Sequence, residues 1–278
     1  MVVATMPAMT HRRSLLLSLG ALPLLAAAQS TATPAVEPVE RPDWAPFFAD
    51  ARAVGSLLVL DERPGSAGCW VHGAERARRR YTPASTFKIP HSLFALDAGV
   101  LKDEFQVIPW DGRRHKTDSW NRDQDLRSAM RNSVVWVYEG FARDIGLPRE
   151  AAYLRAIDYG NALASGASPF WVEGDLAIAC TEQIAFLQRL HRNRLPFRVE
   201  HQRLVKDVMV TEAGADWILR SKTGWSGSIG RWVGWVEWPT GPVFFALNID
   251  TPDRLADLPK RQSITRAVLQ TLGALPPG

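Results

Sequence analysis

The stretch YTPASTFKIPHSLFALDAG, residues 81–99, joins a turn-forming segment to an apolar run with a helical pattern. Ser85 and Lys88 stand three residues apart where the turn-like Thr82-Pro83-Ala84 gives way to that run. Side chains at this spacing on a helix share one face and can meet. Free backbone N–H groups at a helix start also favour developing negative charge. The stretch therefore predicts a nucleophilic serine beside a lysine base.

The composition of the chain is that of an ordinary globular protein. Its 278 residues are 46% hydrophobic and 22% charged, which supports a sizeable core and argues against disorder or a coiled coil. Residues 1–28 are predicted to be a signal peptide, because Arg12 and Arg13 precede an apolar stretch and three alanines fit a cleavage site. The apolar stretch is too short to span a bilayer, and both Sec and twin-arginine export stay open. We expect an exported protein without a stable membrane anchor.

The net charge argues against a nucleic-acid partner, and the two cysteines do not indicate a disulfide framework. Removal of the leader, which contains Arg12 and Arg13, lowers the formal net charge from +4 to +2, so we expect no nucleic-acid partner. The basic run at 76–80 is typical of a solvated face. Cys69 and Cys180 lie far apart in the sequence and do not form a disulfide framework, so their pairing is left open.

Hydrophobic periodicity predicts strands near both ends of the chain and helices between them. A helix over 43–55 precedes a strand pair at 55–62 and 69–73, joined by a turn at 63–65. The middle, 86–213, is mostly helical in pattern, with Pro90 predicted to kink the first helix. Strands follow at 217–224, 231–238 and 242–250, and a helix closes the chain at 261–272. Residues 29–278 are thus predicted to form one α/β domain, with a central antiparallel sheet completed by both termini, terminal helices and a helical subdomain.

Two further motifs carry possible chemistry. Lys222-Thr223-Gly224 ends a strand-like run, where an ammonium can meet an anionic group and a glycine lets a ligand amide approach closely. Taken alone, this motif also fits a surface strand followed by a turn. Ser133 follows a helical pattern among apolar residues, where a serine is usually satisfied by local backbone. In this order, Ser-x-x-Lys, an internal serine and Lys-Thr-Gly form the set of serine β-lactamases and penicillin-binding proteins.

The resemblance extends over nearly the whole chain after the leader. The sequence resembles the class D β-lactamases, the oxacillinases, and most resembles their narrow-spectrum branch, through Ser85-Thr86-Phe87-Lys88, Ser133-Val134-Val135, Tyr159-Gly160-Asn161, Phe170-Trp171-Val172-Glu173-Gly174, Lys222-Thr223-Gly224-Trp225 and Trp232-Val233-Gly234-Trp235. It departs from the family at Arg231, where a tryptophan is usual, and at Cys180, near a usual serine. These departures bear on fine specificity and local stability.

The resemblance implies a fold, a reaction and a set of roles. The fold is that of serine β-lactamases and penicillin-binding proteins, and the reaction is opening of the β-lactam ring of penicillins, including oxacillin-type compounds, with antibiotic resistance as the outcome. Ser85 forms an acyl-enzyme and Lys88, carbamylated by carbon dioxide, is the general base. The remaining roles are the proton relay Ser133, the carbamate-supporting Val135 and Trp171, the catalytic Lys222, and the substrate-binding Thr223, Gly224, Trp225 and Arg261, with backbone N–H groups of Ser85 and Trp225 as the oxyanion hole.

Other assignments fit the sequence less well. The six histidines show no paired-ligand spacing, so we expect no metal, and His91 is predicted to be a satisfied helix histidine. No other cofactor is expected. A β-lactam sensor that stays acylated and a peptidoglycan carboxypeptidase share the three motifs and remain the alternatives. The resemblance implies a periplasmic enzyme of a Gram-negative bacterium that acts on small β-lactams, with a homodimer left open.

Overall fold

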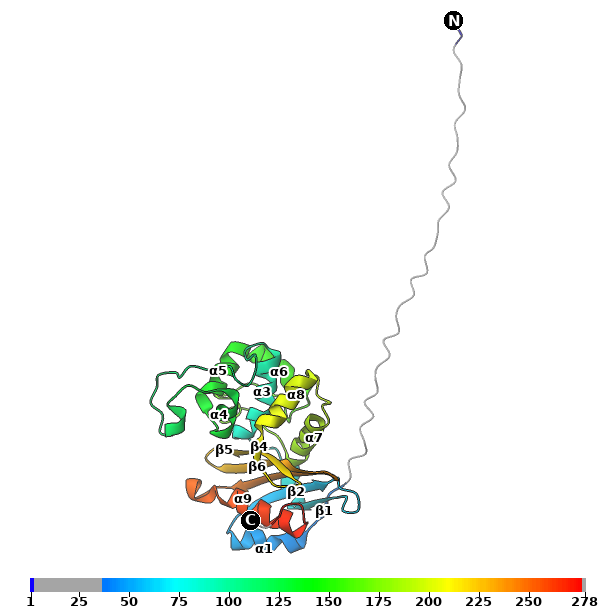
Figure 1. The fold of residues 1–278 in the computed structure, drawn as a ribbon, viewed down its shortest axis with the longest axis vertical. Coiled ribbons are helices and arrows are strands. Elements are labelled where there is room, and N and C mark those ends of the chain that lie inside the picture. Colours follow the sequence, from blue (N-terminus) through cyan, green and yellow to red (C-terminus); the bar gives the residue numbers. More distant parts are fainter. Residues whose placement is uncertain (3–36, 277–278) are drawn as a thin grey trace. The chain divides into compact units, whose positions relative to one another are not determined.

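The computed structural model describes residues 1–2 and 37–276, so the predicted signal peptide lies outside the described residues, apart from its first two positions. Figure 1 shows a sheet with a helical layer on each side. In the described part of the chain, no helix has the length and apolar character needed to cross a bilayer.

The sheet has the strand order β1-β3-β2-β7-β6-β5-β4, so strands from both ends of the chain meet at its centre. β2 and β7 pair along their length, from Gly55 opposite Ile249 to Asp61 opposite Val243. All pairs are antiparallel except β1 with β3. The strands are β1 (Val39–Glu40), β2 (Gly55–Asp61), β3 (Gly68–His72), β4 (Val210–Ala213), β5 (Ile218–Trp225), β6 (Ile229–Trp238) and β7 (Gly241–Asp250).

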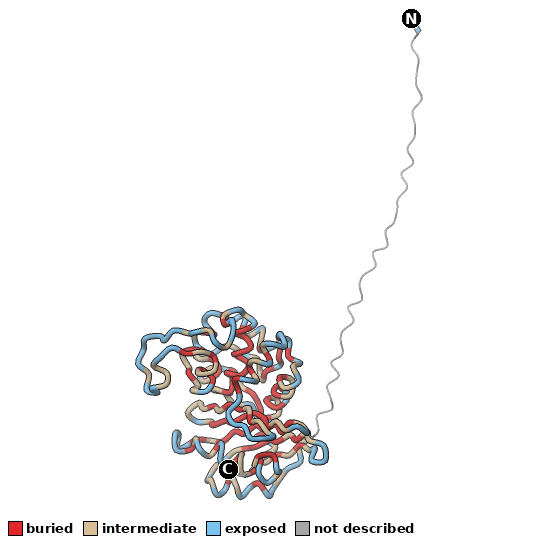
Figure 2. The backbone as a smooth tube through the Cα atoms, viewed as in Figure 1, coloured by how far each residue is buried: buried red, intermediate tan, exposed pale blue. Residues whose placement is uncertain are grey.

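Alternate residues of the central strands enter two separate cores. On β7, Phe245 and Leu247 belong to the core that includes Ile264 and Val268 of α9 (Lys260–Thr271) and Phe48 of α1 (Ala45–Asp50). The residue between them, Ala246, belongs to the larger core under the helical layer. This two-residue period buries both faces of the central strands, where much of the backbone is red in Figure 2, whereas the edge strands β1 and β4 are exposed.

The larger layer consists of helices from the middle of the chain. Residues of its core include Leu93, Phe94 and Phe141, all buried. The helices of the middle are α2 (Ala74–Arg78), η2 (Ala84–Phe87), α3 (Lys88–Asp97), η3 (Asp118–Trp120), α4 (Leu126–Arg131), α5 (Val135–Ile145), α6 (Leu147–Ala156), α7 (Cys180–His191) and α8 (Val199–Val208); η1 (Pro42–Trp44) and η4 (Arg254–Asp257) lie nearer the two termini.

The predicted α/β architecture is confirmed, with differences in detail. The turn between β6 and β7 is shorter than predicted, since Trp238 pairs with Gly241. The end of the stretch predicted to be mostly helical is strand β4, which pairs with β5. Pro90 is the third residue of α3 and lies in its first turn, where its missing N–H removes no intrahelical bond, so the helix continues through the proline.

Candidate functional site

Ser85 and Lys88 lie at the junction of two helical segments. Ser85 is in the short helix η2, and Lys88 is the first residue of α3, which continues from it. Lys88 Nζ lies 3.3 Å from Ser85 Oγ. Ser85 is partly exposed while Lys88 is fully buried. The hydroxyl is therefore accessible to a substrate, and the amine beside it is shielded from water.

The backbone before Ser85 is held by the segment around Trp171. Ala84 donates its N–H to the carbonyl of Trp171 at 2.8 Å, and the hydroxyl of Thr82 donates to the same carbonyl at 2.9 Å. Ala84 has a φ of 47°, a left-handed conformation that is costly for a residue with a Cβ. Two hydrogen bonds to one carbonyl hold this strained turn, so the position of Ser85 depends on a segment more than eighty residues away.

The surroundings of Lys88 favour its neutral form. Burial lowers the pKa of Lys88 well below its ordinary value, the nearby Lys222 ammonium lowers it further, and Glu139 opposes the shift. Nζ lies 4.7 Å from the centre of the Tyr138 ring. Tyr138 belongs to α5 and was missed by sequence reasoning, because nothing local marks one aromatic residue of an amphipathic helix as the one over the amine.

Ser133 occupies the connection between α4 and α5. Its φ is 56°, again in the left-handed region, and its N–H donates to the carbonyl of Met130 at 3.3 Å. The neighbouring Val134 donates to Ala129, so the whole connection is tied to α4. A strained non-glycine residue fixed in this way is typical of a functional position, and it differs from the ordinary helix serine that the local sequence alone favours.

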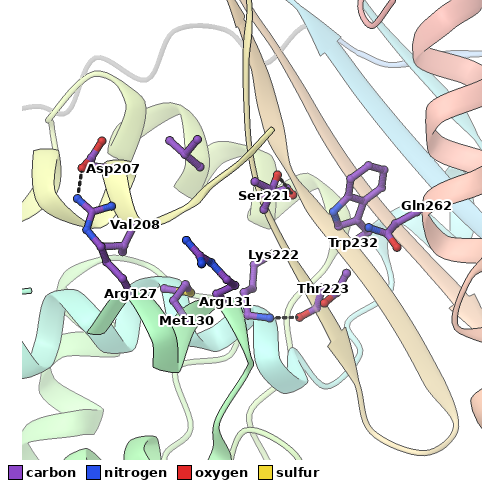
Figure 3. Close-up of a pocket in the computed structure, with 12 residues that line it drawn as sticks. Arg127, Met130, Arg131, Asp207, Val208, Ser221, Lys222, Thr223, Trp232 and Gln262 are labelled. Atoms are coloured by element: carbon purple, nitrogen blue, oxygen red, sulfur yellow. Dashed lines mark hydrogen bonds and ion pairs between the residues drawn. The ribbon is translucent and has the colours of Figure 1, made fainter. Parts of the chain in front are cut away.

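Lys222 and Thr223 line a cavity of about 480 Å³ between β5 and α4 (Figure 3). Lys222 is 5% exposed and donates from Nζ to the carbonyl of Thr223 at 3.1 Å. Burial lowers the pKa of Lys222 to about 7, and the positive charge of Arg261 contributes. Arg131 of α4 lines the same cavity. The cavity thus contains several basic groups, suited to an anionic ligand.

Gly224 brings η2 against β5. A Cβ at this position would lie 2.8 Å from the carbonyl oxygen of Pro83 and 3.2 Å from the N of Thr86. The backbone on either side of Ser85 therefore fills the space on the Cβ side of Gly224. The glycine is needed because two backbones pack here.

Arg261 and Trp225 meet the same end of β5. Arg261 extends from α9 and donates from Nη1 to the carbonyl of Gly224 at 2.8 Å. Burial lowers the pKa of Arg261 to about 10. Trp225 ends β5, and its Nε1 donates to Thr251 Oγ1 at 3.2 Å. The fold thus brings Arg261 to the strand that carries Lys222 and Thr223, although Arg261 follows them by 39 and 38 residues in the sequence.

Trp171 lies in an aromatic cluster around the start of α3. Its ring centre is 5.6 Å from that of Phe87 and 5.1 Å from that of His91. Trp171 is buried, and its Nε1 has no hydrogen-bond partner among the described residues. Val135 is the first residue of α5 and is partly exposed, one turn before Tyr138.

The two family departures are both buried. Arg231 donates from Nη1 to the carbonyls of Tyr81 at 3.2 Å and Ile178 at 3.0 Å, which ties β6 to the segments that flank the serine and tryptophan motifs. Cys180 begins α7 and accepts a hydrogen bond from Asn248 Nδ2 at 3.1 Å. Cys69 and Cys180 are both free thiols. Among the described residues, no group of three or more His, Cys, Asp or Glu side chains could hold a metal ion.

Comparison with known proteins agrees with this geometry. Residues 55–270 match the family model of the penicillin-binding protein transpeptidase domain. The chain is 61% identical over 239 residues to β-lactamase OXA-3 of Pseudomonas aeruginosa and 60% identical over 240 residues to β-lactamase OXA-2 of Salmonella typhimurium, each alignment covering 86% of this chain and 87% of the relative. The crystal structure of the class D β-lactamase YbXI from Nostoc superimposes with a TM-score of 0.79 at 38% identity, covering 84% of this chain and 99% of that one.

A serine and a buried lysine at a helix start, packed against a strand bearing Lys-Thr-Gly, define a protein of the penicillin-recognising transpeptidase fold. Within that fold, the chain belongs to the class D β-lactamases of the OXA type. It is an enzyme that hydrolyses the β-lactam amide bond, and the sensor and carboxypeptidase alternatives are not favoured.

Proposed function

We propose that this enzyme hydrolyses penicillins, including oxacillin-type compounds, through an acyl-enzyme on Ser85, with carbamylated Lys88 as the general base. The observation that carries the proposal is the buried amine of Lys88 at 3.3 Å from the partly exposed hydroxyl of Ser85. An alcohol is a poor nucleophile until a nearby base takes its proton. A lysine whose pKa is lowered by burial is available as that base near neutral pH.

Acylation requires a bond to form and a bond to break. Ser85 Oγ attacks the lactam carbonyl carbon and loses its proton to the base at position 88, and the C–N bond of the ring then breaks. Ser133 relays a proton to the leaving nitrogen, with Lys222 as a further catalytic group. The N–H groups of Ser85 and Trp225 stabilise the oxyanion, each such donor contributing about 3 kcal/mol. Water, activated by the same base, then hydrolyses the ester and frees Ser85.

Carbamylation of Lys88 by carbon dioxide fits the residues present. The Nε1 donor of Trp171 is buried without a partner in the aromatic cluster that also encloses Lys88. A buried donor without an acceptor is costly, and acceptor oxygens on the amine would relieve that cost. The carbamate supplies a carboxylate-like base when it is present. Trp171 would hold it, and Val135 and Tyr138 of α5 would help to exclude water.

The substrate carboxylate would be bound by Lys222, Thr223 and Arg261. Lys222 and Thr223 line the cavity with an amine and a hydroxyl, and the guanidinium of Arg261 lies at the end of the same strand, on the carbonyl of Gly224. Gly224 and Trp225 continue the strand beside them. We place the enzyme in the periplasm of a Gram-negative bacterium, after removal of residues 1–28, acting on small β-lactams without a membrane anchor, a metal or a nucleic-acid partner. A homodimer is compatible with this role.

The central test is the S85A variant. We expect steady hydrolysis of oxacillin and nitrocefin by the wild type and loss of turnover in S85A, with intact mass spectrometry showing a penicilloyl adduct on the wild type alone. Unchanged turnover in S85A would remove Ser85 from its role. A wild-type burst that stops at one equivalent per protein would instead support the sensor alternative.

The W171F variant tests the proposed base. Phenylalanine keeps much of the ring packing but removes the Nε1 donor, so we expect W171F to need more bicarbonate for half-maximal activity, by about tenfold for one lost hydrogen bond to a charged group. Labelled carbon dioxide should give a carbamate carbon signal in the NMR spectrum of the wild type. Absence of that signal, together with wild-type activity that is indifferent to bicarbonate, would contradict carbamylation.

A further inference from the structure

A second pair of buried polar groups lies behind the catalytic lysine. His91 follows Lys88 by three residues on α3, and its Nε2 lies 2.7 Å from Oε1 of Glu150 in the first turn of α6. Both side chains have no exposed surface. The sequence predicts that His91 is a helix histidine with a hydrogen-bond partner. That partner is Glu150, which lies 59 residues away in the sequence.

Burying this pair of polar side chains carries an unusual free-energy cost. Burial of polar groups is unfavourable unless they are hydrogen-bonded, and here Nδ1 of His91 and Oε2 of Glu150 have no partner among the described residues. Only the bond between Nε2 and Oε1 offsets this cost. This bond does not by itself explain why an apolar core contains a histidine at all.

The His91 ring contacts the aromatic residues that surround Lys88. Its centre lies 5.1 Å from that of Trp171, 4.9 Å from that of Phe87 and 5.6 Å from that of Tyr138. Tyr138 is the ring over Lys88 Nζ, and Trp171 carries the unpartnered donor. One imidazole thus touches both aromatic residues that define the lysine pocket. The carboxylate of Glu150 fixes the rotation of that imidazole.

We propose that Glu150 and His91 form a positioning pair that holds Trp171 and Tyr138 in place around Lys88 and thereby sets the affinity of Lys88 for carbon dioxide. This inference rests on the proposed carbamylation of Lys88. Neither residue touches the substrate. Loss of the pair is expected to weaken carbamylation while leaving the chemistry of an already carbamylated enzyme intact, so excess bicarbonate should restore turnover.

The decisive variant is E150M, which keeps the length of the side chain but removes the acceptor. Stranding the Nε2–H donor of His91 is expected to raise the bicarbonate concentration for half-maximal oxacillin hydrolysis by about tenfold, with kcat recovering at saturating bicarbonate. E150Q retains a carbonyl oxygen for Nε2–H and should stay near the wild type. In NMR with labelled carbon dioxide, E150M should need more bicarbonate than E150Q or the wild type to develop the carbamate signal.

Two controls separate positioning from general damage. L154A shortens a buried side chain one turn later on the same helix, so it should lower the melting temperature without changing the bicarbonate requirement. The double variant H91F/E150M keeps a ring between Trp171 and Tyr138 and leaves no polar group unpaired, so it should regain the wild-type requirement. If E150M fails to fold, H91N replaces it, with a raised requirement expected.

The outcomes distinguish this inference from the proposed function. A wild-type carbamate signal with an unchanged bicarbonate requirement in E150M and H91N would overturn the positioning role and leave the carbamylated base intact. A loss of kcat in E150M that bicarbonate does not restore would overturn it as well. A wild type without any carbamate would remove the proposed base and this inference together.

Discussion

Lys88 and Lys222 are two buried amines for which burial disfavours the ammonium form. Burial lowers both pKa values, and the charge of Lys222 contributes to the shift of Lys88. The sequence placed both lysines in motifs, and the resemblance implied their roles. The extent of their burial comes from side chains of several helices and strands, so it could not be read from the motifs alone.

The lowered pKa of Lys222 has a consequence for stability. The folded pKa is about 7 and the ordinary value is 10.5, so between these pH values the unfolded chain binds a proton at this position that the folded chain does not. The free energy of unfolding should therefore rise with pH across this window, by at most about 1.4 kcal/mol per pH unit from this residue.

The K222M variant isolates this contribution. Urea denaturation of wild type and K222M at pH 7, 8, 9 and 10 should give a difference in unfolding free energy, wild type minus variant, that increases with pH. Titrating groups that do not interact with Lys222 contribute equally to both proteins and cancel, while Lys88, whose pKa Lys222 lowers, changes the difference in the same direction. A difference that is flat or that falls over this range would mean that Lys222 keeps its proton in the folded protein.

At the scale of elements, the site depends on how closely η2 packs on β5. The strand, the helix start and the Lys-Thr-Gly motif were all predictable from local pattern, because periodicity and turn residues act within a few positions. Their contact was not predictable from local pattern. The structure shows that Pro83 and Thr86 fill the space on the Cβ side of Gly224.

The G224A variant tests this packing. The added Cβ would meet backbone atoms that cannot give way cheaply, so we expect about 2 kcal/mol lower stability, and displacement of Ser85 should reduce kcat/KM by about 100-fold. G140A is the matched control, because its Cβ would approach only the end of the Arg143 side chain inside helix α5. We expect G140A to retain full activity and to be slightly more stable. Equal activity of the two variants would contradict the packing argument.

At the scale of the molecule, the turn after β2 is tied to the C-terminal helix. Arg63 forms an ion pair with Asp61 at 2.7 Å and donates to the carbonyls of Leu272 at 3.0 Å and Gly273 at 2.7 Å. The Asp61 side chain is 1% exposed. The sequence identified this segment only as a turn, because an arginine in a turn gives no local sign of a partner two hundred residues away.

R63A should therefore destabilise the whole domain. Removal of the guanidinium leaves the buried carboxylate of Asp61 with the backbone N–H of residue 63 but without its ion pair, and it removes a donor from two carbonyls. We expect a loss of about 3 kcal/mol in calorimetry or urea denaturation. R143A removes a partner of the exposed Arg143–Asp144 pair and should change stability by about 0.5 kcal/mol or less. Similar losses in both variants would show that the Arg63 interactions add nothing specific.

The sequence by itself determined most of the elements, the order of the three motifs and, through its resemblance to the oxacillinases, the class of enzyme. These depend on periodicity, turn chemistry and spacing, which act over short distances along the chain. Only the tertiary structure decided that Tyr138 lies over Lys88, that His91 meets Glu150 and that Gly224 makes room for a backbone. These contacts form when helices and strands from distant parts of the chain pack together, because the neighbours of a buried side chain are set by shape and burial across the whole core.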